Sequence, residues 1–252
     1  MKTGLVLSGG GARGVAHIGM LKALEEFGIT VDCIAGTSAG AIVGALYAYG
    51  YSPDKIFEII STTGFFKSVR PAWSFTGLLS LDGLRTMLLN YIPENNFAVL
   101  KIPMTVATTD IRKGKSEYFS SGELITPILA SACVPAIFNP VQIKGNVYVD
   151  GGILDNLPVR CIRHECDVVI GSHCNFISPD VDIKNIRNVV ERTLLMAIGG
   201  NTISSKALCD VLIEPPGLGK YSGFELNKAS ELFDIGYSFT KANFSKSDFE
   251  KI

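Results

Sequence analysis

The chain has 252 residues, of which 47% are hydrophobic, and its formal net charge is −1. With a mean hydropathy of +0.29 it is neither disordered nor fibrous, and its 23 basic residues, balanced by 24 acidic ones, form no basic stripe of the kind that binds nucleic acid. No linker, repeat or low-complexity tract divides the sequence, so we expect a single domain over residues 1–252.

Strand-like and helix-like segments alternate along the chain. In the first half, strands are predicted at residues 5–7 and 33–35, and helices from residue 15 to Gly28, at 39–49 and after Ser52-Pro53. In the second half, strands are predicted at 104–108, 117–120, 141–143, 147–149, 167–172 and 211–214, with helices at 123–133 and near Val189 and Ala229. This alternation predicts an α/β fold with a doubly wound, mostly parallel sheet and its functional sites at the carboxyl ends of strands.

The segment Gly36-Thr37-Ser38-Ala39-Gly40 is a G-x-S-x-G sequence between a predicted strand and a predicted helix. In a nucleophile elbow the chain turns sharply at this point and leaves the serine hydroxyl exposed at the start of the helix. Gly36 and Gly40 fit such a turn because the residues two before and two after the serine crowd each other. The sequence therefore predicts that Ser38 is a nucleophile.

A glycine loop, Gly9-Gly10-Gly11-Ala12-Arg13-Gly14, follows the first predicted strand and has two interpretations. Its G-x-G-x-x-G spacing is also that of dinucleotide-binding loops, but those need an acidic residue at the end of the second strand, whereas Asp32 precedes that strand. The favoured interpretation is an oxyanion hole, in which backbone N–H groups point at a developing negative charge. Arg13 either adds charge to this hole or braces the loop.

A serine nucleophile needs a base, and Asp150-Gly151-Gly152 stands at the end of a predicted strand. The two glycines would let another backbone segment approach the carboxylate closely. Taken alone, an aspartate in this position is also typical of a turn or a cap.

Together, Ser8–Gly14, Gly36–Gly40 and Asp150–Gly152 resemble in order and spacing the three signature blocks of the patatin-like phospholipase family. Ser131–Pro135 and Asn156–Pro158 also resemble the stretches found in bacterial members, and the resemblance runs from Leu5 to about Ile170. It implies a patatin-like three-layer fold with a central mostly parallel sheet and a nucleophile elbow.

The resemblance also implies hydrolysis of lipid esters by a Ser-Asp dyad, with Ser38 as the nucleophile and Asp150 as the base. It places Gly9, Gly10, Gly11 and Arg13 at the oxyanion hole. Gly14, Gly36, Gly40, Gly151 and Gly152 would support these motifs, and neither a metal ion nor an organic cofactor is expected. The expected activity is that of a phospholipase or lysophospholipase; the alternative is a regulatory or interaction protein on the same fold with little lipase activity.

Histidines and cysteines offer two other sites. His173 follows a predicted strand and would complete the order Ser, Asp, His of a catalytic triad, whereas His17 and His164 are expected to pack and to lie on the surface. Cys161 and Cys166 could join His164 and His173 around a metal ion, but their spacing lacks a second ligand pair. Free and mostly buried thiols are the favoured interpretation of the six cysteines.

Residues 64–84 carry aromatic side chains among Pro71, Gly77 and Gly83 without helical periodicity. We expect an acyl-chain entrance there, with ordinary packing or a subunit interface as the alternatives.

The basic residues at 112–115 favour a solvated hairpin turn, with contact to a headgroup as the alternative. We expect a cytoplasmic protein without a signal peptide or spanning helix that contacts membranes peripherally; its oligomeric state is not predicted.

Overall fold

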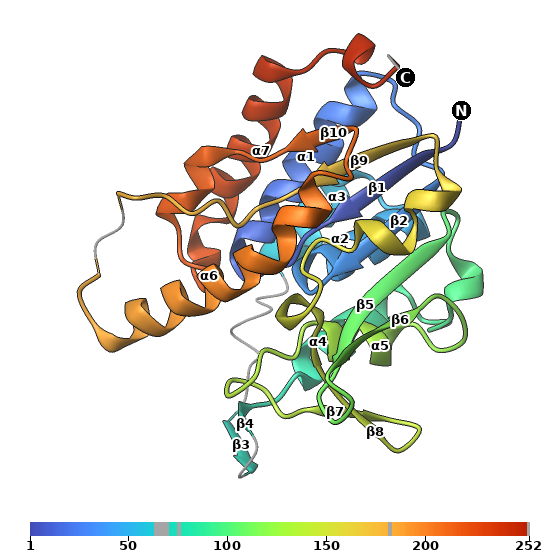
Figure 1. Cartoon of the computed structure of the whole chain (residues 1–252). Helices are drawn as coiled ribbons and strands as arrows, with labels where there is room; N and C mark the ends of the chain where they lie inside the picture. The colour runs from blue at the N-terminus through green and yellow to red at the C-terminus, as the bar shows by residue number, and fades with distance from the viewer. Residues whose placement is uncertain (63–70, 75–76, 181–182, 251–252) are drawn as a thin grey trace.

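An eight-stranded sheet forms the centre of the structure, a computed structural model that describes residues 1–62, 71–74, 77–180 and 183–250 (Figure 1). The strands are β1 (Thr3–Leu7), β2 (Cys33–Thr37), β5 (Met104–Asp110), β6 (Lys115–Phe119), β7 (Val141–Ile143), β8 (Asn146–Asp150), β9 (Val168–Ser172) and β10 (Val211–Ile213). Their order is β10-β9-β1-β2-β5-β8-β7, with β6 paired to β5. The five strands from β10 to β5 are parallel, and the other pairs are antiparallel.

The register of the parallel strands brings their carboxyl ends level with one another. Leu7, the last residue of β1, pairs with both Gly36 of β2 and Ser172 of β9. The loops that follow these three strands therefore begin at one edge of the sheet, as the sequence predicted.

Strand β8 reaches the same place from the opposite direction. Thr37 pairs with Ala107 and Asp150 with Thr108, while β6 occupies the other edge of β5 at both positions. Strands β2 and β8 thus share one edge of β5, and their carboxyl ends meet between Ala107 and Thr108.

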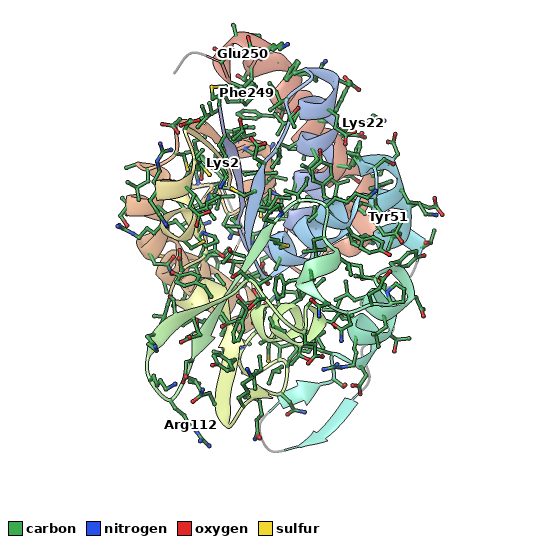
Figure 2. The ribbon with its side chains drawn as sticks, turned by 90° about the vertical axis from the view of Figure 1, so that its right-hand side faces the viewer. Lys2, Lys22, Tyr51, Arg112, Phe249 and Glu250 are labelled. Atoms are coloured by element: carbon green, nitrogen blue, oxygen red, sulfur yellow. The ribbon has the colours of Figure 1, made fainter. Side chains whose placement is uncertain are left out.

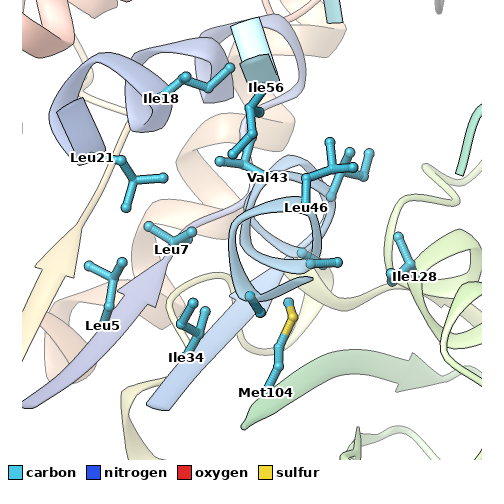
Figure 3. Close-up of a cluster of buried hydrophobic side chains, with 14 of the residues drawn as sticks. Leu5, Leu7, Ile18, Leu21, Ile34, Val43, Leu46, Ile56, Met104 and Ile128 are labelled. Atoms are coloured by element: carbon cyan, nitrogen blue, oxygen red, sulfur yellow. The ribbon is translucent and has the colours of Figure 1, made fainter. Parts of the chain in front are cut away.

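Helices cover one face of the sheet more heavily than the other. Their bounds are α1 (Val15–Glu26), α2 (Ala39–Tyr49), α3 (Pro53–Thr62), α4 (Asp82–Tyr91), α5 (Ile125–Ser131), α6 (Ile186–Lys206) and α7 (Ala229–Asn243). Side chains of the first face, such as Leu5, Leu7 and Ile34, pack against α1, α2 and α3 in the main core (Figure 3). On the opposite face, Val6, Ala35 and Val169 pack against the 3-10 turns of residues 157–166.

Helices α1 and α7 approach each other closely because glycines stand where they meet. A Cβ on Gly19 would overlap the carbonyl of Phe233, and one on Gly236 would overlap the carbonyl of Ala16. The carboxyl-terminal helix is thereby held against the first helix of the chain.

Most predicted elements are confirmed within one to three residues at each boundary, including α2 and the left-handed Gly50 after it. The strongly basic turn is a surface hairpin: Arg112 points outward at its tip (Figure 2), and Gly114 has a φ of +62°. No helix in the described part of the chain has the length and unbroken apolar surface needed to cross a bilayer.

Residues 64–70 and 75–76 of the predicted entrance at 64–84 lie outside the described residues. Within that range, β3 (Pro71–Ser74) and β4 (Gly77–Leu79) form a separate two-stranded sheet, where no regular structure was predicted. Helix α4 begins at Asp82 and was also not predicted. Only Leu84, Met87 and Leu88 of this helix are buried, and the polar residues between them leave too few apolar positions for a recognisable helical period.

Candidate active site

Ser38 occupies a strained turn between β2 and α2. Its φ of +52° and ψ of −119° define a backbone conformation that is unfavourable for any residue with a side chain, so the surrounding structure must impose these angles. The crossing of Gly36 and Gly40 imposes them here: a Cβ on Gly36 would lie 2.7 Å from the carbonyl oxygen of Gly40, and one on Gly40 would overlap the carbonyl of Leu7. The turn therefore needs glycine at both positions, which leaves the Ser38 side chain at the start of α2.

Ser131, at the end of α5, fixes the backbone of this turn. Its hydroxyl accepts a hydrogen bond from the N–H of Ser38 at 2.8 Å and donates one to the carbonyl of Ala107 at 2.6 Å. Ser131 is fully buried, so both bonds are made out of contact with water. The elbow is consequently attached to β5 through one side chain.

The hydroxyl of Ser38 donates a hydrogen bond to Oδ2 of Asp150 at 2.8 Å. The other oxygen, Oδ1, accepts from the N–H of Gly152 at 2.8 Å. Both Ser38 and Asp150 are 7% exposed. Burial raises the pKa of Asp150 to about 6, and the bonds from Gly152 and Ser38 offset part of that rise, so the carboxylate is mostly ionised at neutral pH.

Glycines allow Asp150 to reach this position. A Cβ on Gly151 would overlap the carbonyl of Ala107, and one on Gly152 would lie 2.9 Å from Oδ1 of Asn156. Asn201 of α6 holds the same turn from outside, because its Nδ2 donates to the carbonyls of Gly152 and Ile153 at 3.0 and 3.1 Å.

Side chains that follow β9 hold the glycine loop through the carbonyl of Gly9. The carbonyl of Gly9 accepts from Nδ2 of Asn175 at 2.7 Å and from the thiol of Cys174 at 3.2 Å. In a trans peptide the N–H of the next residue points the opposite way, so the N–H of Gly10 is directed away from Asn175. Within the described residues, neither Gly10 nor Gly11 has an acceptor for its N–H group.

The N–H of Gly9 is not available as a donor, which corrects that part of the sequence prediction. It donates to the backbone carbonyl of Asn156 at 3.1 Å. Gly9 instead provides space, since a Cβ there would lie 3.1 Å from Cβ of Ser38. Gly14 plays a similar part, because a Cβ there would overlap the side chain of Ala39.

Arg13 is buried beside the glycine loop, with 2% of its surface exposed. Its Nη2 lies 3.6 Å from Oε1 of Glu191 on α6, and its Nε has no partner among the described residues. Burial lowers the pKa of Arg13. The ion pair favours a bracing role, although Arg13 also lines the cavity described below.

Two of the three histidines are buried, but neither hydrogen-bonds to Ser38 or Asp150. Burial lowers the pKa of His17 to about 4; its Nε2–H donates to the carbonyl of Ser8 at 2.9 Å, and its Nδ1 accepts from Ser172 at 2.8 Å. Nδ1 of His173 lies 2.7 Å from Oε1 of Glu214. The exposed His164 lies beside Glu165.

The six cysteines are free thiols, and four of them are buried, as expected. Cys161 donates to the carbonyl of Pro158, while the sulfur of Cys166 lies 3.1 Å from that of Cys33. Within the described residues, no three histidine, cysteine or acidic side chains are grouped as ligands for a metal ion. Asp32, which the dinucleotide interpretation required near the loop, accepts from the N–H of Thr3 at the far end of β1.

A largely apolar cavity of about 150 Å³ opens beside Ser38 and Asp150. The glycine loop forms one wall, and α2, α4 and the residues after α5 form others. Its apolar lining includes Ile42, Val43, Met87, Val134, Phe138, Leu194, Leu195 and Ile198. This lining suits the hydrocarbon part of a ligand, and the polar groups of Ser38 and Asp150 lie in the wall of the same cavity.

Residues 5–161 match the family model described as "Patatin-like phospholipase". The chain belongs to the patatin-like phospholipase family. The matched residues include the end of β1 from Leu5, the glycine loop, the elbow and the turn after β8, whereas α6 and α7 lie beyond them.

Similarity to individual relatives extends over larger proteins. An NTE family protein of Mycobacterium bovis, named as uncharacterized, is 36% identical over 64% of this chain and 45% of its own length. Lysophospholipase NTE1 of Mycosarcoma maydis is 36% identical over 63% of this chain and 9% of its own length. The corresponding protein of Aspergillus fumigatus is 28% identical over 94% of this chain and 18% of its own. The chain thus spans less than half the length of these relatives.

The fold is also similar to the crystal structure of VipD from Legionella pneumophila, with a TM-score of 0.56 at 16% identity. The similarity covers 96% of this chain and 66% of that one. It bears out the predicted fold.

Several contacts around the patatin-family motifs were not predicted. Ser131 and Asn156 stand in stretches that resemble family members, but their hydrogen bonds depend on how β5, β8 and the loops meet. Asn175 had a weaker signal: it follows β9 at the same sheet edge as the glycine loop. Glu191 and Asn201 had none, because α6 shows no motif.

Proposed function

We propose that this chain is a serine acyl hydrolase that cleaves fatty-acid esters of lipids with Ser38 and Asp150. The observation that carries the proposal is the 2.8 Å hydrogen bond from the Ser38 hydroxyl to a buried carboxylate beside an apolar cavity. A serine hydroxyl becomes a useful nucleophile when an adjacent base accepts its proton. Asp150 is the group positioned to do so.

Acylation begins when Oγ of Ser38 attacks the ester carbonyl and Asp150 accepts the hydroxyl proton. As the tetrahedral intermediate collapses, Asp150 returns this proton to the departing alcohol and the acyl group remains on Ser38. A water molecule then gives a proton to Asp150 and attacks the acyl-enzyme. The serine recovers its proton as the fatty acid leaves.

The N–H groups of Gly10 and Gly11 are proposed to stabilise the oxyanion of each intermediate. Both lack an acceptor among the described residues, and the bonds to the Gly9 carbonyl fix the adjacent peptide. Donors that are oriented before the reaction need no rearrangement when charge develops, and such donors commonly supply a large part of the rate enhancement. Arg13 contributes positive charge behind the loop while bracing it.

A single-chain lipid ester is the proposed substrate class. Two of the relatives above are named lysophospholipases, and the cavity beside Ser38 is apolar and small. A substrate panel tests this proposal: hydrolysis of lysophosphatidylcholine should be faster than hydrolysis of a diacyl phosphatidylcholine. A faster rate on the diacyl lipid would contradict the substrate class without contradicting the Ser-Asp mechanism.

A fluorophosphonate probe tests the nucleophile itself. Wild-type protein should be labelled at Ser38, and Ser38→Ala should not be labelled. Absence of both labelling and ester hydrolysis in the wild type would favour the alternative of a regulatory protein on this fold.

Peripheral membrane contact is proposed for the outward face of α6. Every described exposed side chain on this helix between Ile186 and Ser204 is uncharged, and Ile186, Val190, Met196 and Ile203 are each at least 60% exposed. Leu194, Leu195 and Ile198 of the same helix line the cavity, so a lipid surface against α6 would lie next to the site where an acyl chain enters. Helix α6 extends away from the sheet at the lower left of Figure 1. Apolar patches of this kind commonly mark contacts with lipid or protein.

Cosedimentation with phosphatidylcholine vesicles tests this surface. Val190→Glu with Met196→Glu should reduce binding severalfold, whereas Ile111→Glu, which changes another residue that is more than half exposed, on the β5–β6 hairpin, should not. Unchanged binding of the double variant would exclude α6 as the lipid contact. Concentration-dependent dimerisation that the double variant abolishes would assign the face to a second copy instead.

A further inference from the structure

A short segment from the carboxyl-terminal part of the chain lies against the glycine loop. The carbonyl of Gly223 accepts a hydrogen bond from the N–H of Ala12 at 2.7 Å. The same carbonyl lies so close to Gly11 that a Cβ there would overlap it, and Gly11 has a φ of +59°. Gly223 therefore determines the direction of the Ala12 N–H and leaves the N–H groups of Gly10 and Gly11 free.

Glu191 of α6 holds that segment in place. Its Oε1 accepts from the N–H of Gly223 at 2.7 Å, and its Oε2 accepts from the hydroxyl of Ser222 at 2.8 Å. Oε1 also lies 3.6 Å from Nη2 of Arg13. One carboxylate thus contacts both the segment that presses on the glycine loop and the arginine inside that loop.

Burial makes these contacts strong. The side chain of Glu191 is 15% exposed and that of Arg13 is 3% exposed. A buried arginine without a counter-charge is strongly destabilising, and hydrogen bonds to a carboxylate are stronger than those between neutral groups. The Glu191 carboxylate therefore accepts hydrogen bonds from two neutral groups, on Ser222 and Gly223, and supplies the counter-charge for Arg13.

We propose that Glu191 is a positioning residue for the oxyanion loop. It acts through Gly223 on Ala12, and through Arg13 on the same turn, so that Gly10 and Gly11 keep their N–H groups directed at the substrate oxyanion. The inference rests on the proposed hydrolase function. It adds that a residue outside the segment matched by the family model completes the site.

The test compares Glu191→Ala with Glu191→Gln in the full chain, with Glu231→Ala as the control. Glu231 is another acceptor in this region, but it is exposed and bonds to Tyr221 and Lys228 rather than to Gly223. We expect Glu191→Ala to lower kcat about tenfold to a hundredfold with KM changed less than about threefold, because loss of oxyanion stabilisation acts on the transition state. Glu191→Gln keeps one acceptor oxygen and should recover part of kcat, while Glu231→Ala should resemble the wild type.

A trifluoromethyl ketone with a fatty-acyl chain gives a second readout. This inhibitor forms an oxyanion adduct with the serine, so its affinity should fall in step with kcat/KM in the Glu191 variants. Binding of an unreactive ether analogue should not change. A purely structural role would weaken both compounds alike, and that outcome would overturn the inference.

Other outcomes separate this inference from the proposed function. Wild-type protein that neither hydrolyses esters nor reacts with fluorophosphonate would refute the function itself. Active wild-type protein with an unchanged kcat in Glu191→Ala would refute only the positioning role. If Glu191→Ala does not fold, Glu191→Gln decides: a kcat equal to that of the wild type would overturn the inference.

Discussion

The backbone N–H of Ser38 and the hydroxyl of Ser131 are joined by a 2.8 Å hydrogen bond that ties the elbow to α5. Because Ser131 also donates to Ala107, it connects the strained turn to the strand along which β2 and β8 meet.

Replacing Ser131 with alanine should therefore lower both stability and activity. It leaves the buried N–H of Ser38 and the carbonyl of Ala107 without their partner, at a cost of about 1–3 kcal/mol in the free energy of unfolding. Turnover should fall because Ser38 loses a support for its strained conformation. Urea denaturation and kcat measured together check this, and a variant with wild-type kcat would show that Gly36 and Gly40 suffice to hold the turn.

Ser38→Ala and Asp150→Asn should each abolish ester hydrolysis, and the double variant should be no slower than either single one. Residues that act as one catalytic unit are not additive, because either loss disables the same step. Steady-state rates of the three variants provide the measurement. His173→Ala serves as the control: loss of activity there, together with substantial activity in Asp150→Asn, would favour a triad.

Activity should depend on the ionisation of Asp150. Since Asp150 is the proposed base and its pKa is raised to about 6, kcat/KM should be lost as pH falls through about 6 and should level off above it. A pH profile of kcat/KM on a substrate without ionisable groups measures this midpoint. A midpoint near 4 would mean that burial does not govern this carboxylate.

The same pKa affects stability with a definite sign. The folded protein holds the Asp150 proton more tightly than the unfolded chain, so the stability contributed by the protonated group is present below about pH 4 and is lost as pH rises through about 6. The two-unit rise corresponds to about 3 kcal/mol. Relative to wild type, Asp150→Asn should therefore gain stability between pH 4.5 and pH 7.5. Urea denaturation at both values tests this, and an equal difference at both would contradict it.

Gly10→Ala should lower kcat more than it raises KM. A Cβ at this position would overlap the sulfur of Cys174 and lie 3.0 Å from Oδ1 of Asn175, so it would disturb the contacts that orient the Gly9–Gly10 peptide. Gly200→Ala is a matched control because nothing lies within 4 Å of its added methyl group. A change in KM alone would place Gly10 in substrate binding rather than in oxyanion stabilisation.

The elements and the motif residues could be predicted from sequence because each has a local cause. A glycine on each side of Ser38, an apolar strand before it and an alanine-rich helix after it identify the elbow without reference to the rest of the chain. The same is true of the glycine loop. Periodicity failed at α4, where the buried residues are few, and it gave no register for any strand.

The meeting of Ser38 and Asp150 could not be derived from parallel topology. The sequence argument placed Asp150 at the carboxyl edge of a parallel sheet, but β8 is antiparallel to β5. Its end reaches Ser38 because β2 and β8 share an edge of β5, which depends on pairing over a long sequence separation. Asn175 and Glu191 depend on tertiary contacts of the same kind.

Helix α6 is a spacer of fixed length between the glycine loop and the turn after β8. Glu191 contacts the segment that supports the glycine loop, and Asn201 contacts the turn after Asp150. The ten residue steps from Glu191 to Asn201 correspond to about 15 Å of helix, and each step turns the helix by about 100°. Single substitutions along α6 preserve this distance and phase, whereas an insertion or deletion of one residue would rotate one anchor away from its loop. The helix is therefore constrained in length even where its sequence is free to vary.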